Sequence, residues 1–188
     1  TGRVKLQDGF EWSDGNTALV RNIEFDIAKK TPILSDFKVG LPVQLEYNGN
    51  TKSANVSMRD SYYGYGTITT KYNGSTDLPK EVGNYVVTVD VAEGQNFNAI
   101  TDLEVGSFTI EKARPYPTAL PNNLKGKKGE TLSTVALPTD AKGTWAWKDG
   151  TIIMDTVGEQ RFETIFTPND TVHYKTVDDI ILLVTVEE

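Results

Sequence analysis

The sequence predicts an all-β fold of the sandwich type. Short segments rich in β-branched and aromatic residues largely alternate apolar with polar side chains, which is typical of half-buried strands. The dipeptides Asn48-Gly49, Asn73-Gly74 and Asp149-Gly150 are typical of hairpin turns. No stretch shows helical periodicity. Because short strands recur with turns between them, we expect an all-β sandwich architecture with Greek-key connections. The predicted strands are residues 42–47, 66–72, 84–91, 105–112, 143–148, 160–167 and 179–188.

The same features also recur twice along the sequence in the same order. A glycine-ended turn, a Val-Gly pair, a long strand, a polar turn, an aromatic residue and a closing strand follow one another twice. The Val-Gly pairs are residues 82–83 and 157–158, and the aromatic residues are Phe97 and Tyr174. Tandem self-similarity of this length indicates repeated modules.

Proline marks the boundary between the two copies. Residues 112–121 (KARPYPTALP) hold three prolines, and proline stiffens an extended connection because it cannot donate to a strand ladder. A weaker break falls at residues 28–32. We therefore expect two sandwich domains preceded by an N-terminal strand segment. That segment is either the remnant of a preceding module or a set of strands that completes the next one. The expected boundaries are 1–28, 29–112 and 113–188.

Composition excludes several classes of function. The net charge is −7 and no basic patch stands out, which argues against nucleic acid as a partner. The absence of cysteine excludes disulfides, thiolate zinc sites and cysteine nucleophiles. No apolar run approaches the roughly 20 residues that span a bilayer, so we expect no membrane insertion. The first residues do not form a signal peptide, and we expect a segment of a longer protein.

Two stretches resemble a known family. Residues 66–113, with their YNG, VGNYVVTV and FTIEKA runs, resemble bacterial immunoglobulin-like repeats of the MBG type. Residues 157–187 are similar to a related immunoglobulin-like repeat, with Phe166 and residues 173–176 (HYKT) as mild departures from its usual motif. The resemblance implies tandem immunoglobulin-like sandwiches in a bacterial cell-surface or secreted protein. It implies no shared catalytic or binding residues.

Five aromatic residues are the candidate ligand-binding residues. Trp145 and Trp147 point to the same face of a predicted strand, where they either pack in the core or stack on a sugar ring. Tyr62, Tyr63 and Tyr65 lie in a glycine-rich stretch that is either a binding loop or a bent strand edge. Sugar stacking requires exposed, coplanar rings.

Catalytic and metal sites are not expected. His173 is the only histidine, and we interpret it as a surface turn residue because no nucleophile motif accompanies it. The carboxylates lack both the converging spacing of a calcium site and the cleft of a glycosidase, so we interpret them as solvated turn residues. We predict no catalytic residue, no metal and no cofactor.

The leading hypothesis is a non-enzymatic module on the bacterial cell surface or in the extracellular space, acting as a stalk, spacer or adhesion segment. Its expected partners are neighbouring repeats of the same parent protein, with glycans or host surface proteins as further possibilities. The alternative is a carbohydrate-binding module that uses the five aromatic residues. A glycan-degrading enzyme is a third hypothesis that no motif supports.

Overall fold

The computed structural model describes residues 2–5, 7, 10, 12–15, 18, 20–59 and 62–188. Within these residues the regular elements are β-strands and two single-turn 3-10 helices, so the prediction of an all-β fold is confirmed. The strands form four sheets, with the orders β1-β2, β3-β4, β5-β6-β7 and β8-β11-β10-β9. The elements are β1 (Gly2–Lys5), β2 (Val20–Ile23), η1 (Leu34–Asp36), β3 (Phe37–Gly40), β4 (Asn55–Met58), β5 (Ile68–Tyr72), β6 (Gly83–Val91), β7 (Ile100–Ile110), β8 (Leu124–Lys127), η2 (Leu132–Thr134), β9 (Gly143–Trp147), β10 (Gly158–Pro168) and β11 (Val177–Glu187).

The first hydrophobic core lies between two sheets. Sheet β3-β4 contributes Phe37 and Met58, and sheet β5-β6-β7 contributes alternating residues such as Val87, Val89 and Val91. Because side chains alternate across a strand, these three valines share the buried face of β6. We call this cluster the first core; its buried members are Phe37, Met58, Tyr72, Val87, Val89, Val91, Phe97, Val105, Phe108 and Ile110.

The second hydrophobic core covers one face of the four-stranded sheet. In that sheet β11 pairs antiparallel with β10 and parallel with β8, while β9 pairs with β10. The opposite side is closed by η2 and by a bridge between Thr131 and Ile153, which bring Leu132 and Met154 onto the sheet. We call this cluster the second core; its buried members are Leu124, Leu132, Val135, Met154, Phe162, Leu182, Val184 and Val186.

One predicted strand is wrong. Residues 42–47 form no strand; instead Leu45 and Tyr47 exchange two backbone hydrogen bonds with Glu111, and only Glu46 forms an isolated bridge to it. The physical reason is that the chain meets the end of β7 over this short stretch alone. Strands β3, β4 and β8, each four residues long, were not predicted.

Both cores receive the incoming chain in the same way. Lys30 bridges in parallel to Phe97, and Ala113 bridges in parallel to Tyr174. In the first case the two hydrogen bonds connect Lys30 with the residues on either side of Phe97, both at 2.9 Å; in the second they connect Ala113 with the neighbours of Tyr174, at 2.9 and 3.0 Å. The repeated aromatic residue of the sequence therefore marks the point where the chain enters each core.

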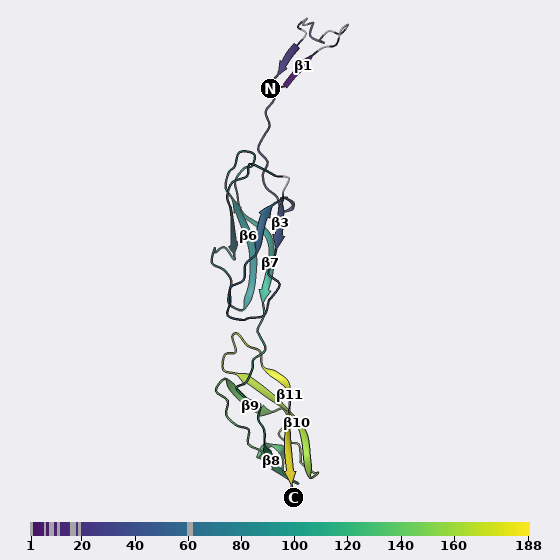
Figure 1. The fold of residues 1–188 in the computed structure, drawn as a ribbon, viewed down its shortest axis with the longest axis vertical. Helices are drawn as coiled ribbons and strands as arrows, with labels where there is room; N and C mark the ends of the chain where they lie inside the picture. The colour runs from purple at the N-terminus through teal and green to yellow at the C-terminus, as the bar shows by residue number, and fades with distance from the viewer. Residues whose placement is uncertain are drawn as a thin grey trace.

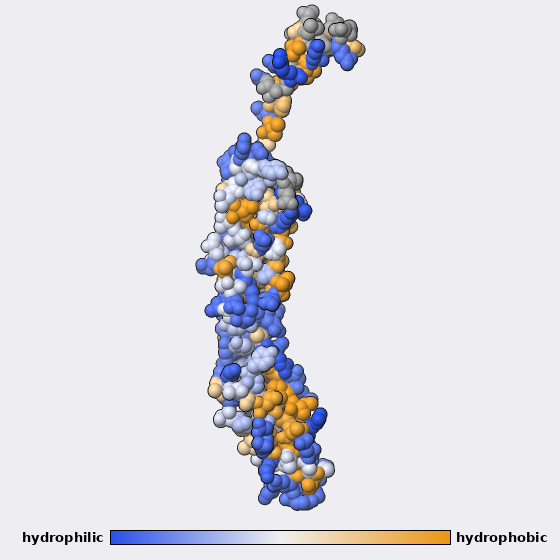
Figure 2. All heavy atoms as spheres, viewed as in Figure 1, coloured by the Kyte–Doolittle hydropathy of each residue, from blue (hydrophilic) through white to orange (hydrophobic). Residues whose placement is uncertain are grey.

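The molecule is elongated (Figure 1). Strand β1, paired with β2, lies at one end, strands β3 to β7 lie in the middle and strands β8 to β11 lie at the other end (Figure 1). Figure 2 shows apolar side chains gathered on the surface of the part of the molecule that holds β8 to β11. On β11, Ile181 and Leu183 are exposed. No helix within the described residues is long and apolar enough to cross a membrane.

Candidate functional site at the junction of the two cores

The two cores are joined by a very short connection. Glu111 is fixed to the first core because its amide donates to the carbonyl of Leu45 at 2.7 Å and its carbonyl accepts from Tyr47 at 2.9 Å. Ala113 is fixed to the second core by the hydrogen bonds described above. Lys112 alone lies between these two anchored residues, and its ammonium donates to the carbonyl of Thr171 at 2.6 Å. The backbone therefore has little freedom to bend between the cores.

The proline-rich stretch predicted as a linker packs on the second core. Ala113 and Pro115 are buried. Arg114 forms a two-pronged ion pair with Asp179 on β11, with N···O distances of 2.6 and 3.0 Å. The connection between the two backbone anchors, Glu111 and Ala113, is thus much shorter than residues 112–121.

Side chains from both cores meet around His173, and we call this contact the junction. The imidazole of His173 stacks on the ring of Tyr47, with centroids 4.1 Å apart and planes 16° apart. Its Nδ1 lies 2.7 Å from Asp170 Oδ2, and its Nε2 contacts Glu81 Oε2. Tyr174 packs edge-on against Tyr47 at 5.9 Å. The junction consists of Tyr47, Glu81 and Lys112 on the side of the first core and Asp170, His173 and Tyr174 on the side of the second.

Local turn chemistry fixes the position of His173. Asp170 Oδ1 accepts the backbone amides of Val172 and His173 at 3.2 and 3.1 Å, a turn that aspartate commonly stabilises. Its second oxygen holds the imidazole, so one carboxylate shapes the turn and orients the ring. On the other side, the hydroxyl of Tyr85 donates to the carbonyl of Glu81 at 2.9 Å and holds that turn in place.

The charges at the junction shift the titration of its groups. Hydrogen bonding to Asp170, and then to Glu81, raises the pKa of His173 above its ordinary value of 6.5. The hydrogen bond from His173 in turn lowers the pKa of Asp170. Burial, followed by the charge of Glu81, raises the pKa of the Tyr47 hydroxyl, which therefore stays neutral at physiological pH. The charged imidazole is thus the favoured form between the two carboxylates.

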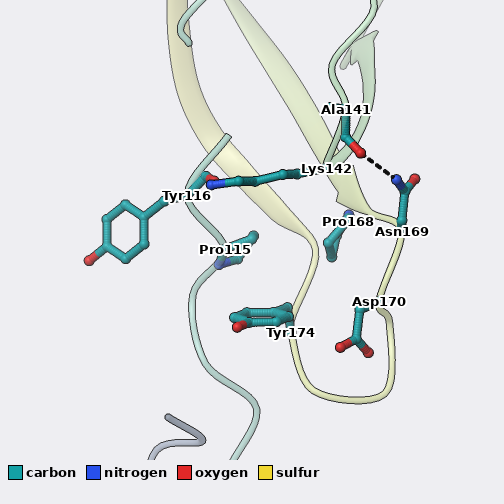
Figure 3. A pocket seen from close by; sticks show the side chains of 8 residues that line it. All are labelled: Pro115, Tyr116, Ala141, Lys142, Pro168, Asn169, Asp170 and Tyr174. Atoms are coloured by element: carbon teal, nitrogen blue, oxygen red, sulfur yellow. Dashed lines mark hydrogen bonds between the residues drawn. The ribbon is translucent and has the colours of Figure 1, made fainter. Parts of the chain in front are cut away.

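A pocket of about 350 Å³ opens beside the junction (Figure 3). The ring of Tyr174 lies along one side, the side chain of Lys142 crosses the opposite side, and Pro115 and Pro168 lie between them (Figure 3). The ring of Tyr116 points away from this space (Figure 3). Because Asp170 and Tyr174 belong to both features, one wall of the pocket is built from the junction itself.

Two of the three predicted tyrosines, Tyr62 and Tyr65, pack against Phe97 at the far pole of the first core. Tyr62 and Tyr65 each meet the ring of Phe97 edge-on, at 5.8 and 6.5 Å, and the ammonium of Lys30 lies 4.4 Å from the centre of the Tyr62 ring. Tyr63 is 75% exposed and Tyr65 is 40% exposed. The structure therefore brings Tyr62 and Tyr65 together by packing, and their role in ligand binding stays a prediction.

The two predicted tryptophans face the second core. Trp145 packs on buried Phe166 at 4.8 Å, and Trp147 packs edge-on against Phe162 at 6.1 Å. The indole N–H of Trp147 donates to the carbonyl of Val135 at 2.9 Å. Both side chains are half-buried, so they do not form the exposed pair that sugar stacking requires.

Sequence reasoning missed the junction. His173 was interpreted as a surface turn residue, yet its side chain is only 20% exposed and touches the first core. Its partner Glu81 lies 92 positions away, so no local spacing could connect them. The available signal was the position of the only histidine beside the repeated aromatic residue Tyr174.

The interpretation of carboxylates as solvated turn residues is also incomplete. Asp36 is 1% exposed and pairs with Lys30, and Lys71 pairs with Asp90 and Asp102. In the part of the chain that the structure describes, no group of three or more histidine, cysteine or acidic side chains could hold a metal ion.

Comparison with known proteins found no match to a family model, to a curated protein or to a solved structure.

Proposed function

We propose that this chain is a non-enzymatic spacer or adhesion segment of a bacterial cell-surface or secreted protein. In this proposal, residues 29–112 and 113–188 are two immunoglobulin-like Greek-key sandwiches, each built around one of the two cores, and they follow an N-terminal strand segment. The function is geometric, because stiff units joined end to end hold a distal part of the parent protein at a distance. Neighbouring repeats of that protein are the expected partners.

The junction is the observation that supports this proposal most strongly. A flexible tether would leave polar linker residues between the cores, as in glycine- and serine-rich connections. Here a single residue separates two backbone anchors, and a ring stack and charged contacts bridge the cores beside it. Bending the molecule would break these contacts together, which favours one interdomain angle.

Small-angle X-ray scattering on residues 1–188 tests the proposal at about pH 6, where His173 is charged. We expect scattering from an elongated particle with a narrow range of angles between the cores. Tyr47→Ala removes the ring that stacks on His173 and should widen that range. Tyr63→Ala removes an exposed tyrosine at the opposite pole of the first core and serves as the matched control.

Wild-type scattering that fits two freely jointed particles would contradict the spacer proposal. So would a Tyr47→Ala variant whose range of angles equals that of the Tyr63→Ala control.

A further inference from the structure

We propose that the junction is a pH-sensitive latch: neutralising His173 releases its contact with Glu81 and frees the two cores to bend relative to each other. This inference rests on the proposed spacer function, because it concerns how the stiffness of that spacer is set. It assigns a regulatory role to the only histidine of the chain.

The argument begins with the number of protons on the ring. A charged imidazole carries an N–H on each nitrogen and can donate to two acceptors, whereas a neutral imidazole has only one N–H. In the junction each nitrogen faces a carboxylate, Asp170 at Nδ1 and Glu81 at Nε2. Only the charged ring can satisfy both carboxylates at once.

The structure also determines which contact is lost. Asp170 lies three residues from His173 and is held in the same turn by two backbone amides. Glu81 approaches from the first core, and its side chain is 58% exposed, so it can move into water. The remaining N–H therefore stays on Nδ1 with Asp170. The lone pair on Nε2 then faces the Glu81 carboxylate, and two acceptors repel each other.

The surrounding groups strengthen this dependence. The groups that contact His173 are Asp170 in its own turn, Glu81 in the turn before β6 and Tyr47 in the loop that meets β7. Tyr174 packs against the same Tyr47 ring. The cation that binds the same turn from the first core is Lys112, which contacts the carbonyl of Thr171. Losing the imidazolium charge leaves two carboxylates close together with a neutral ring between them.

The sign of the effect follows from the raised pKa of His173, whose main causes are Asp170 and then Glu81. The stabilising contact is fully present below the ordinary value of 6.5 and is lost as pH rises through the raised pKa. The lowered pKa of Asp170 means that the contribution of its own contact with His173 is lost only as pH falls below the ordinary value of 3.8. The latch is therefore closed in mildly acidic solution and opens toward alkaline pH.

Distance measurements between spin labels on the two cores test this proposal. The chain has no cysteine, so Val86→Cys on β6 and Leu183→Cys on β11 give one label in each core at exposed strand positions. We expect a narrow distance distribution below the measured pKa of His173 and a broad one above it. Nuclear magnetic resonance of the single histidine supplies that pKa in the same protein, and we expect it above 6.5.

Glu81→Gln is the decisive variant. An amide can accept a hydrogen bond from a charged ring and donate one to the lone pair of a neutral ring, so it tolerates both states. We expect the width of its distance distribution to be independent of pH, with the pKa of His173 lower than in the wild type. Asp155→Asn is the control, because it changes an exposed carboxylate that is hydrogen-bonded to its neighbour Thr156. The width of its distance distribution should depend on pH as that of the wild type does.

The outcomes separate this inference from the proposed function. A narrow distribution at every pH would overturn the latch while leaving the stiff spacer in place. A broad distribution at every pH would overturn both. A Glu81→Gln protein that broadens with pH as the wild type does would also overturn the latch, because the Glu81 contact would then not be the one released.

Discussion

At the scale of single residues, the ion pair between half-exposed Lys30 and buried Asp36 shows how a charge is accommodated where the chain enters the first core. Asp36 is nearly inaccessible, and its carboxylate accepts the amide of Ile33 at 3.0 Å and contacts the ammonium of Lys30. Burial alone would raise the pKa of Asp36, but the hydrogen bonds from Lys30 and Ile33 outweigh it and lower that pKa. The paired carboxylate thus stays ionised while buried.

Replacing Asp36 with alanine should destabilise the first core. The change leaves the Ile33 amide without its acceptor and removes the ion-pair partner of Lys30, whose ammonium keeps its hydrogen bond to the Tyr62 hydroxyl. An amide left unsatisfied in this way costs about 1–3 kcal/mol of unfolding free energy. Denaturant unfolding followed by resonances of the first core measures the loss. Asp77→Ala, which removes an exposed carboxylate bonded only locally to Ser75, should change that free energy by less than about 0.5 kcal/mol. If Asp36→Ala and Asp77→Ala lowered the unfolding free energy equally, the ion pair of Asp36 with Lys30 would have no special role in stability.

At the scale of elements, a glycine stands at the start of the corresponding strand in each half of the molecule: Gly66 precedes β5, and Gly143 begins β9. A Cβ atom on Gly66 would lie 2.2 Å from the carbonyl oxygen of Ala92, and one on Gly143 would lie 2.4 Å from that of Thr167. In each case the clash is with backbone at the far end of the neighbouring strand, β6 or β10. Threonine follows glycine in both places, at Thr67 and Thr144. Glycine is needed there because two backbones approach more closely than a residue with a side chain allows.

Gly66→Ala should consequently destabilise the first core by about 1–3 kcal/mol, the usual cost of overpacking. Gly40→Ala is its control, because a Cβ atom there would lie at an ordinary 3.7 Å from the carbonyl oxygen of Asn55. Thermal unfolding of the two variants, monitored by the circular dichroism of the strands, provides the comparison. A Gly66→Ala protein that unfolds at the wild-type temperature would mean that β5 and β6 shift apart without cost.

The length of each strand decides how far the sequence could predict the fold. The long strands β6, β10 and β11 were predictable because alternation over nine or eleven residues repeats the burial pattern several times. Strands β3, β4 and β8 span four residues, too few for a period to stand out, and their pairing depends on distant partners. The packing of Trp147 on the core was one of two readings that strand alternation left open. The contact between Glu81 and His173 was unpredictable because only the relative placement of the two cores creates it.

At the scale of the whole molecule, the two clusters of buried side chains have no member in common, and the junction bridges them. Each cluster excludes water by itself. The free energy that comes from burying apolar surface is therefore divided between two separate units. The junction adds a small number of polar and aromatic contacts to this arrangement. We therefore expect the cores to unfold in distinct steps that the junction couples weakly.

The positions of the tryptophans make this division measurable. Two of the three, Trp145 and Trp147, lie on β9 in the sheet that carries the second core, so in a Trp12→Phe background fluorescence reports on that sheet alone. Phe166→Ala should lower the unfolding free energy seen by fluorescence by about 3–5 kcal/mol, because it empties a fully buried site. Phe37→Ala removes the same kind of side chain from the first core. It should leave the unfolding transition seen by fluorescence nearly unchanged and lower the unfolding free energy that is measured from resonances of the first core. If either variant shifted both signals equally, the cores would unfold as one unit, and stiffness would then come from a continuous fold rather than from the contacts around His173.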